Sequence, residues 1–472
     1  MKNKQLLALI CLLLLLPCLI LPVSANSAQQ HWSGTDATGA VITDGDSPIV
    51  VEKELLTFDL NEFPQNYYAS NEDFLSYTGK VTAEYTFYNP SDMTVTAVLA
   101  FPFGNMPGYG YSYNDVDKYG VSVNGEKIEA IIRHTPYLYS YSSKRFDLDG
   151  SLDLLKNDYV KNGIYSPDTT VTMYYWKVEY DIKAGEKVTN PRVAIDVPKG
   201  DDGRMIYMQN QGGGRIQDDG DYRISGASPI IYVIGEPLDS MPEWKAYKNG
   251  GCNDGEELDA KFVLQESESM TLLDFALEMR EEDSTISDMD WYNIIIFELI
   301  NGRRIDGYPV TSVDRNGGTV NRWYQYEITL EPGERVVNQV VAPMYPAIDM
   351  SYQPTVFNYT YLVSPAITWS EFGELKILIN TPYYLTDCSY NGFEKTDNGY
   401  ELTLNGLPKD EDGKVIDLTF TLSTEEDPVL KSRTPAGILK NIVYFVLFFW
   451  PFLLAGFVLL VIVIIIIKRK RR

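Results

Sequence analysis

Apolar and polar residues alternate along short segments of the chain, separated by turn residues. Every second residue is apolar over 81–87 and again over 95–101, and the intervening segment 89–92 reads Asn-Pro-Ser-Asp. A period of two places apolar side chains on one face of a strand, whereas a helix requires a period of 3.6. Because Asn, Pro, Ser and Asp favour turns, we expect a half-buried β-hairpin over residues 81–101. Pro102 cannot donate to a sheet and should end the second strand.

The same signals recur further along the chain. Residues 121–128 are typical of a second hairpin, with Asn-Gly at its turn. Two more pairs of apolar segments flank Gly185 and Gly333. These two units share Glu, Gly, Glu, Val and Asn at an offset of 148 residues, which indicates either a faint internal repeat or two independent hairpins. Further strands are expected at 356–363, 375–379, 400–404 and 415–422.

Few segments have a helical pattern. One short helix is expected at 151–160. A second is expected at 271–281, where Thr271 and Asp274 form a capping-box pattern. Loops rich in Gly and Asp are expected at 200–203, 212–220 and 248–256, and the last could separate two domains.

Many short strands joined by hairpin turns are typical of β-sandwiches. We therefore predict a mostly β protein with two β-sandwich-like lobes, short helical insertions and one C-terminal transmembrane helix. The predicted segments are a signal peptide at 1–25, a mobile N-terminal segment at 26–46, a first β-sandwich-like domain at 47–250, a second at 251–430, a juxtamembrane linker at 431–441, the transmembrane helix at 442–467 and a cytoplasmic tail at 468–472.

Both ends of the chain indicate the cell envelope. The first 25 residues combine two lysines, an apolar run and Val-Ser-Ala, the pattern of a cleaved secretory signal. Residues 442–467 are uncharged and almost wholly apolar. As a helix they would extend about 39 Å, enough to cross a hydrocarbon core of about 30 Å. Five basic residues follow at 468–472 and favour the cytoplasmic side. We expect a single-pass protein of the cell membrane with its ectodomain outside.

Residues 81–130 resemble the VIT domain, named from vault proteins and inter-alpha-trypsin inhibitor. That family has an Asn-containing turn, an apolar strand ending Phe-Pro-Leu-Pro and then a Gly-turn hairpin. The counterparts here are Asn89, the Phe-Pro-Phe-Gly of residues 101–104, and the pair Asn124 and Gly125. The resemblance implies a β-sandwich interaction module. The Asp-x-Ser-x-Ser metal motif of the von Willebrand A domains that often follow is absent from the sequence, so metal-dependent adhesion of that type is not implied.

The charge balance argues against one class of partner. The chain has 65 acidic and 40 basic residues, a formal net charge of −25. Nucleic acid binding needs clustered Lys and Arg, so we expect no nucleic acid partner. The expected partners are membrane lipid, through the C-terminal helix, and a surface protein or glycan.

Residues suited to catalysis or metal binding are scarce. The two histidines are His31 and His134, too few for the usual zinc site, and His134 is expected at the surface near a strand end. The acidic runs 410–413 and 218–221 lack the full calcium-loop spacing. We predict no metal and no cofactor. The three glycines at 212–214 lack the Lys-Ser/Thr of a phosphate loop and are expected to form a flexible linker. Carboxylates are plentiful, so paired-acid glycoside chemistry remains open as an alternative.

Two sets of residues are candidates for binding or covalent linkage. Three tyrosines at every second position follow each of the two predicted hairpins. If the chain is extended there, the three rings of each set lie on one face of the strand. They would form either a recognition surface or ordinary cover for the sandwich. They are Tyr109, Tyr111, Tyr113, Tyr137, Tyr139 and Tyr141. Outside the signal peptide, Cys252 and Cys388 could form a disulfide or remain two unpaired thiols.

The prediction of function follows from location and from this chemistry. We predict a cell-surface single-pass membrane protein whose ectodomain is non-catalytic and serves binding, adhesion or structure. The alternatives are an extracytoplasmic carboxylate-based hydrolase, or the outer subunit of a membrane complex.

Overall fold

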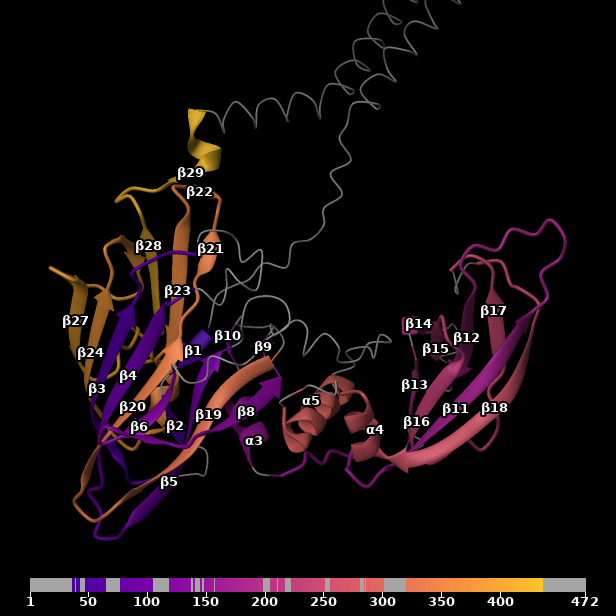
Figure 1. The fold of residues 1–472 in the computed structure, drawn as a ribbon, viewed down its shortest axis with the longest axis horizontal. Coiled ribbons are helices and arrows are strands. Elements are labelled where there is room, and N and C mark those ends of the chain that lie inside the picture. The colour runs from indigo at the N-terminus through magenta and orange to yellow at the C-terminus, as the bar shows by residue number, and fades with distance from the viewer. Residues whose placement is uncertain are drawn as a thin grey trace, which may run out of the picture.

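A computed structural model describes residues 36–64 (except 39 and 43–46), 77–104, 119–156 (except 137, 138, 141–144 and 147), 158–250 (except 198–203, 210 and 217–221), 255–300 (except 281–283 and 285) and 320–435. Most of the described residues lie in strands, which confirms the mostly β class (Figure 1). Within these ranges, no helix has the length and apolar character needed to cross a membrane. The predicted signal peptide and the predicted span at 442–467 lie outside them.

One group of sheets, here called the first sheet group, combines residues from both ends of the described chain. Its largest sheet has the strand order β26 (Glu394–Thr396), β27 (Gly399–Asn405), β24 (Phe372–Asn380), β3 (Val50–Asp59), β4 (Lys80–Tyr88), β20 (Arg335–Pro343), β6 (Gly120–Val123) and β7 (Glu126–Ile128). Neighbouring strands are antiparallel except β24 and β3, which are parallel.

Two smaller sheets complete the first sheet group. One has the order β2 (Val41–Ile42), β5 (Val95–Gly104), β19 (Val320–Leu330) and β8 (Ile131–Pro136). The other has the order β1 (Asp36–Thr38), β23 (Val356–Leu362), β28 (Leu418–Ser423) and β25 (Tyr384–Cys388), with β21 (Ala347–Asp349) also paired to β23. Side chains of all three sheets share one hydrophobic core, which includes Phe58, Leu99 and Phe420. The short pairs are β9 (Tyr139–Ser140) with β10 (Arg145–Phe146), and β22 (Tyr352–Gln353) with β29 (Val429–Leu430).

The second sheet group consists of residues 170–271 and has its own core. One sheet has the order β13 (Arg204–Met208), β16 (Ile230–Gly235), β11 (Thr170–Tyr180) and β18 (Ala260–Thr271). The other has the order β14 (Gln211–Ile216), β15 (Tyr222–Gly226), β12 (Arg192–Val197) and β17 (Trp244–Tyr247). Trp176, Ile195 and Val233 are buried together between them.

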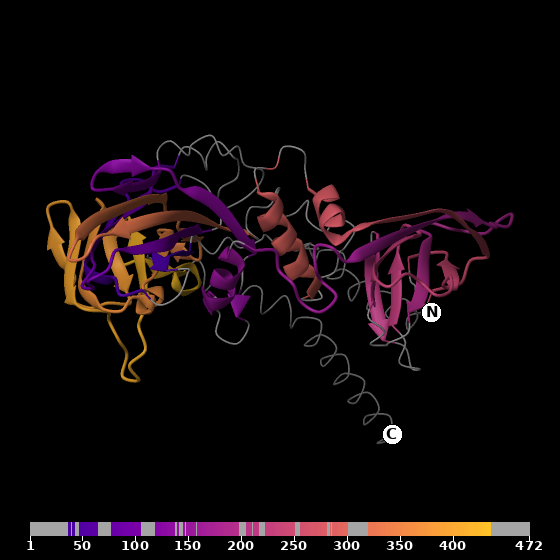
Figure 2. The same cartoon turned by 90° about the horizontal axis from the view of Figure 1, so that it is seen from below.

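Helices lie between the two sheet groups in both views (Figures 1 and 2). These helices are α3 (Leu148–Leu155), α4 (Leu272–Glu278) and α5 (Asp288–Ile300). Two 3-10 turns, η2 (Ser364–Thr368) and η3 (Lys431–Arg433), occur elsewhere, in the C-terminal part of the described chain. A third apolar cluster joins α4 and α5 to one end of the second sheet group, with Phe275, Trp291 and Ile295 buried in it.

The described sheets do not divide at the predicted boundary between residues 250 and 251. β11 pairs with β18 along its whole length, β5 pairs with β19, and β3 pairs with β24. Each of these ladders joins residues from the two sides of that boundary. The second sheet group is inserted between β8 and β19 of the first. Strand pairing over such separations is decided by packing, and alternation in the sequence does not specify the partner.

The hairpin expected at 81–101 was wrong in its pairing. Its two strands exist as β4 and β5, but β4 pairs with β3 and β20, while β5 pairs with β2 and β19. The turn therefore joins two different sheets, as a β-arch. Periodicity gives the same signal for a hairpin and an arch, because in both cases each strand turns one face to a core.

Buried Asn89 fixes this arch against a second one. Its side-chain amide donates to the carbonyl oxygens of Met93 (2.8 Å), Leu330 (3.1 Å) and Glu331 (3.2 Å). Its backbone N–H donates to the Glu334 carbonyl, and its own carbonyl accepts from the Gly333 N–H. The turn after β4 is thus bonded to the turn after β19.

The segments around Gly185 and Gly333 are also arches, since β11 and β12 belong to different sheets, as do β19 and β20. Both turns have the same local structure. The Glu186 carboxylate accepts from the Lys183 N–H (3.0 Å), and the Glu334 carboxylate accepts from the Glu331 N–H (2.7 Å). Gly185 has a φ of 87° and Gly333 a φ of 73°. The offset of 148 residues therefore relates two copies of one turn structure.

Other local predictions had mixed outcomes. The hairpin of β6 and β7 is confirmed, and the N-cap at Thr271 accepts from the Asp274 N–H. The helix expected at 151–160 begins and ends earlier, as α3. Helix α5 was not predicted, because it is buried on most sides and its apolar run hides the helical period. The glycines at 212–214 lie in strand β14 and do not form a linker, since their backbone pairs with β15.

Candidate functional site

Most of the predicted site residues fall outside the described chain. Tyr109, Tyr111, Tyr113, Tyr137 and Tyr141 lie outside the described residues. Tyr139 lies in β9, where its backbone is paired with Phe146 of β10. A tyrosine recognition face therefore stays a prediction.

The predicted disulfide also stays a prediction. Cys388 ends β25, and its side chain packs against the core of the first sheet group. Burial raises the pKa of this thiol, which favours its neutral, less reactive form. Cys252 lies outside the described residues, but the residues that flank it belong to the second sheet group.

An open polar hollow of about 490 Å³ lies at the turn between β11 and β12. It is lined by Glu186, Lys187, Thr189, Lys248, Asn249 and Glu256. The sequence predicted a turn around Gly185 and a loop at 248–256 that could separate two domains, but it predicted neither segment as part of a site. The Thr189 hydroxyl and backbone N–H both donate to the Asn249 side-chain oxygen, which ties the two segments together.

One ammonium group organises the charges of this hollow. Lys248 Nζ lies 2.7 Å from Glu186 Oε1 and 3.1 Å from Glu256 Oε2. The hydrogen bond from Lys248 lowers the pKa of the Glu186 carboxyl, and the backbone N–H of Lys183 lowers it further. The same two carboxylates raise the pKa of Lys248. Glu186 and Lys248 are therefore both ionised at neutral pH. The hollow can offer a partner both signs of charge and a hydroxyl.

A second polar cluster is buried where helix α5 meets strand β8. The Asp290 carboxylate accepts from Arg133 Nε (2.9 Å) and from the His134 backbone N–H (2.8 Å). The Arg133 guanidinium also donates to Gln325 Oε1 (2.7 Å) and to the Leu155 carbonyl (3.0 Å). Asp290, Arg133 and Gln325 are all buried. This ion pair holds α5 on the edge of a sheet, which is a structural role.

His134 corrects a prediction of the sequence. It was expected at the surface, but the residue is only 3% exposed. Burial, with the charges of Arg322 and Arg133, lowers the pKa of His134 to about 3. The imidazole is therefore neutral across the physiological range. Edge strands usually expose their ends, and the sequence gives no sign that α5 covers β8.

A third site, Glu54, was missed by sequence reasoning. A β-bulge between Val51 and Lys53 shifts the alternation of β3, so that Glu54 points inward together with Leu56 and Phe58. The side chain is 1% exposed. The sequence does contain a signal for this burial. Every second residue from 54 to 60 is Glu54, Leu56, Phe58 or Leu60, so in a strand the acid shares one face with three apolar residues.

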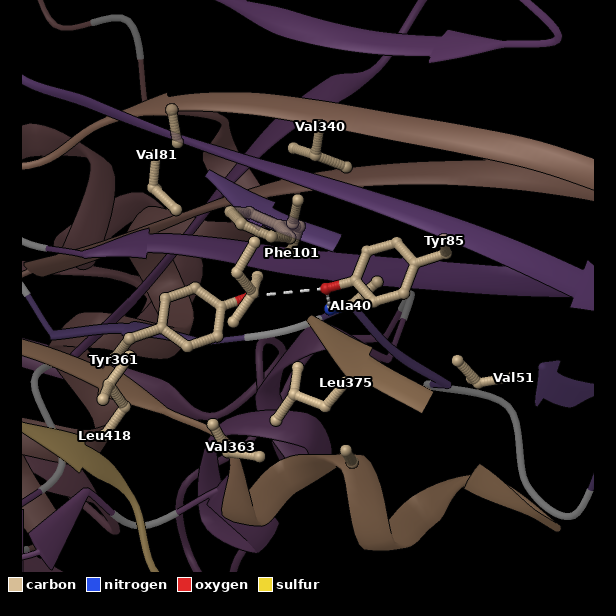
Figure 3. Close-up of a cluster of buried hydrophobic side chains, with 14 of the residues drawn as sticks. Ala40, Val51, Val81, Tyr85, Phe101, Val340, Tyr361, Val363, Leu375 and Leu418 are labelled. Carbon is tan, nitrogen blue, oxygen red and sulfur yellow. Dashed lines mark hydrogen bonds between the residues drawn. The ribbon is translucent and has the colours of Figure 1, made fainter. Parts of the chain in front are cut away.

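Tyrosine hydroxyls surround this carboxyl. Tyr361 donates to Glu54 Oε1 (3.3 Å), and the hydroxyls of Tyr361 and Tyr85 lie 3.4 Å apart. Figure 3 shows these two hydroxyls pointing toward each other, with the backbone nitrogen of Ala40 beside Tyr85. Burial raises the pKa of Glu54 to about 7, although hydrogen bonds from Tyr85 and Tyr361 oppose this. The carboxyl can hold a proton near neutral pH.

The acidic turn at 410–413 binds its own backbone. Asp410 Oδ1 accepts from the backbone N–H groups of Asp412 (3.0 Å) and Lys414 (2.8 Å). Within the described ranges, no group of three His, Cys, Asp or Glu side chains is arranged to hold a metal ion. The other acidic run, 218–221, lies outside those ranges.

Comparison with known proteins adds little to this geometry. No protein-family model matches the chain, and no curated protein matches it. Among solved structures, the chain is similar to a Legionella pneumophila protein provisionally described as a nutrient binding protein. The identity is 10% and the TM-score is 0.28, over 83% of this chain and 71% of the other. A likeness this weak carries no argument about fold or function.

Proposed function

We propose that the chain is a cell-surface, single-pass membrane protein whose ectodomain binds or holds a partner and does not catalyse a reaction. In this proposal the two sheet groups are two β-sandwich lobes. The apolar segment at 442–467 is the anchor, and the basic residues at 468–472 are its cytoplasmic tail. The signal pattern of the first 25 residues supports export. The partner is a surface protein or glycan, and the polar hollow of the second sheet group is its binding site.

One observation favours binding over hydrolysis. A glycoside hydrolase needs one protonated carboxyl, with a raised pKa, beside a second carboxylate in an accessible cleft. Among the carboxyls that the structure describes, the one with a raised pKa is Glu54, which is buried inside the core. In the open hollow, Glu186 has a lowered pKa and shares Lys248 with Glu256. At Glu54 and Glu186, a raised pKa and an accessible position therefore do not coincide.

Two experiments test the proposal. Ending the chain after residue 434 should release folded protein into the medium, and retention of that truncated protein in the membrane fraction would contradict the topology. For the hollow, Lys248→Met should weaken binding of the ectodomain to its own cell surface at least tenfold, a loss of about 1.4 kcal/mol.

The matched control is Lys245→Met, since Lys245 lies nearby on β17 and contacts Asp196 outside the hollow. Equal binding by wild type and both variants would remove the hollow from the proposal. Hydrolysis of cell-surface glycans that is lost in Glu186→Gln or Glu256→Gln would instead establish the enzyme alternative.

A further inference from the structure

Strand β18 is a long open edge of the second sheet group (Figure 1). It has 12 residues and ends its sheet, pairing with β11 on one side, while no strand of the described chain pairs with its other side. The other described strands at sheet edges have six residues or fewer. At alternate residues of an edge strand, the backbone N–H and C=O groups point outward, where another strand can bind them.

The second half of β18 lacks the features that usually protect an edge. Proteins block long edges with proline, lysine, a bulge or a covering element. β18 contains no proline, its one lysine is Lys261 near the start, and its bulge is at Gln265, where the register with β11 shifts. From Glu266 to Thr271 the pairing with β11 is regular, and residues 266–269 are all exposed. This half of the strand can therefore accept a further strand.

The same half of β18 carries an acidic charge. Glu266 and Glu268 are two positions apart in a strand, so their side chains share one face. Neither carboxylate forms an ion pair with a residue that the structure describes. Two lysines of this region are directed to another acid, since Lys177 Nζ lies 2.9 Å from Glu179 Oε1 and Lys261 lies opposite Glu179 in the ladder. The open edge therefore presents two acids for a partner to neutralise.

We propose that residues 266–271 of β18 bind an extended segment of a partner protein, which adds a fifth strand to this four-stranded sheet and carries Lys or Arg at alternate positions. Backbone hydrogen bonds hold that segment, and its basic side chains face Glu266 and Glu268. A second copy of this chain is a poorer partner. If two β18 strands pair about Ser267, Glu266 of one copy meets Glu268 of the other, and like charges repel. This surface is separate from the polar hollow and does not depend on it.

Fluorescence anisotropy of a labelled peptide with the full-length protein tests this proposal. The probe is a capped peptide in which Lys and Thr alternate. Its control has the same residues with every backbone amide N-methylated, which keeps the charge and removes the donors. We expect the probe to bind, and the control to bind about tenfold more weakly or worse, because strand addition requires backbone hydrogen bonds.

A pair of double variants tests the role of charge. Glu266→Lys with Glu268→Lys should weaken binding of the probe about tenfold or more, because two attractions become repulsions. The matched control is Glu236→Lys with Glu243→Lys, which alters the net charge equally at exposed positions between β16 and β17. Equal losses in the two double variants would overturn the proposal, since they would mean that only the net charge attracts the probe.

Two proline variants test the role of the backbone. Neighbouring residues of a strand direct their N–H groups to opposite edges. Of Ser267→Pro and Glu268→Pro, one should therefore break a bond to β11 and lower the melting temperature, while the other removes an outward donor and leaves the fold intact. The stable variant should lose the probe more completely than Glu268→Ala does.

Three outcomes would overturn the proposal at this stage. The first is full binding of the probe by the stable proline variant, or of the N-methylated control by the wild type. The second is loss of the probe in Lys248→Met, which would assign the binding to the hollow. The third is self-association in analytical ultracentrifugation that the stable proline variant abolishes, which would make a second copy of this chain the partner of β18.

Discussion

The buried Asp290 gives the sharpest test of how the helices are fixed to the first sheet group. Its carboxylate accepts from Arg133 Nε and from the His134 N–H, and Arg133 Nη2 lies 2.9 Å from Asp290 Oδ1. Both side chains of the ion pair are almost completely buried, at 4% and 0% exposure. Replacing Asp290 by Ala leaves the buried guanidinium without its counter-charge. We expect the free energy of unfolding to fall by about 3–5 kcal/mol.

Urea unfolding at pH 7, followed by circular dichroism, measures this loss. The exchange rate of the His134 amide gives a local readout, since Asp290 is its acceptor. Asp288→Asn is the matched control on the same helix. Asp288 is 58% exposed and pairs with Arg280, so its loss should cost at most about 1 kcal/mol.

A double variant separates the charge from the packing. Replacing the pair by apolar residues, as Arg133→Met with Asp290→Leu, removes both buried charges. We expect it to be more stable than Asp290→Ala alone, because no unpaired charge remains. A loss below about 1 kcal/mol for Asp290→Ala, within the range of an exposed pair, would refute this reasoning. So would strictly additive effects of Arg133→Met and Asp290→Leu when each is also measured alone, since they would mean that the two charges do not interact.

Three further predictions follow from single contacts. Because the pKa of Glu54 is raised, the folded state binds more protons than the unfolded state between pH 4.5 and about 7. The free energy of unfolding is therefore highest below this pH window and should fall by about 3 kcal/mol as the pH rises through it. Glu54→Gln should remove this fall in urea unfolding, and unchanged pH curves would contradict it. Asn89→Ala should cost about 3 kcal/mol by removing the three hydrogen bonds that the buried Asn89 amide donates, whereas exposed Asn405→Ala should cost little, and equal melting temperatures would disprove this. Gly399→Ala should cost more than Gly413→Ala, because a Cβ at Gly399 would overlap the Ile379 carbonyl while Gly413 faces open space; the reverse order in chemical unfolding would contradict it.

The local structure of the chain could largely be predicted from its residues. Alternation located β4, β5, β23 and β27, because one face of each strand meets a core and the other meets solvent. The Asn-Gly pair at 124 and 125 predicted a tight hairpin, since both residues adopt a positive φ there. Thr271 and Asp274 predicted the start of α4 by direct side-chain capping.

The candidate sites were less accessible to prediction. The turn of Gly185 and the segment around Lys248 are about 60 residues apart and meet through the pairing of β12 with β17 and the hydrogen bonds from Thr189 to Asn249. Glu54 becomes buried through one bulge in β3, and His134 through the approach of α5. Each of these depends on a neighbour that is distant in sequence.

Residues a few positions apart were enough to predict several strands, most of the turns discussed and the chemical character of the two ends. Tertiary structure alone decided that three apparent hairpins are arches, because only packing selects the partner of a strand. It also decided that residues 170–271 form an inserted sheet group with their own core. Finally, it decided which acids are buried, because burial is a property of the assembled layers and a single segment does not specify it.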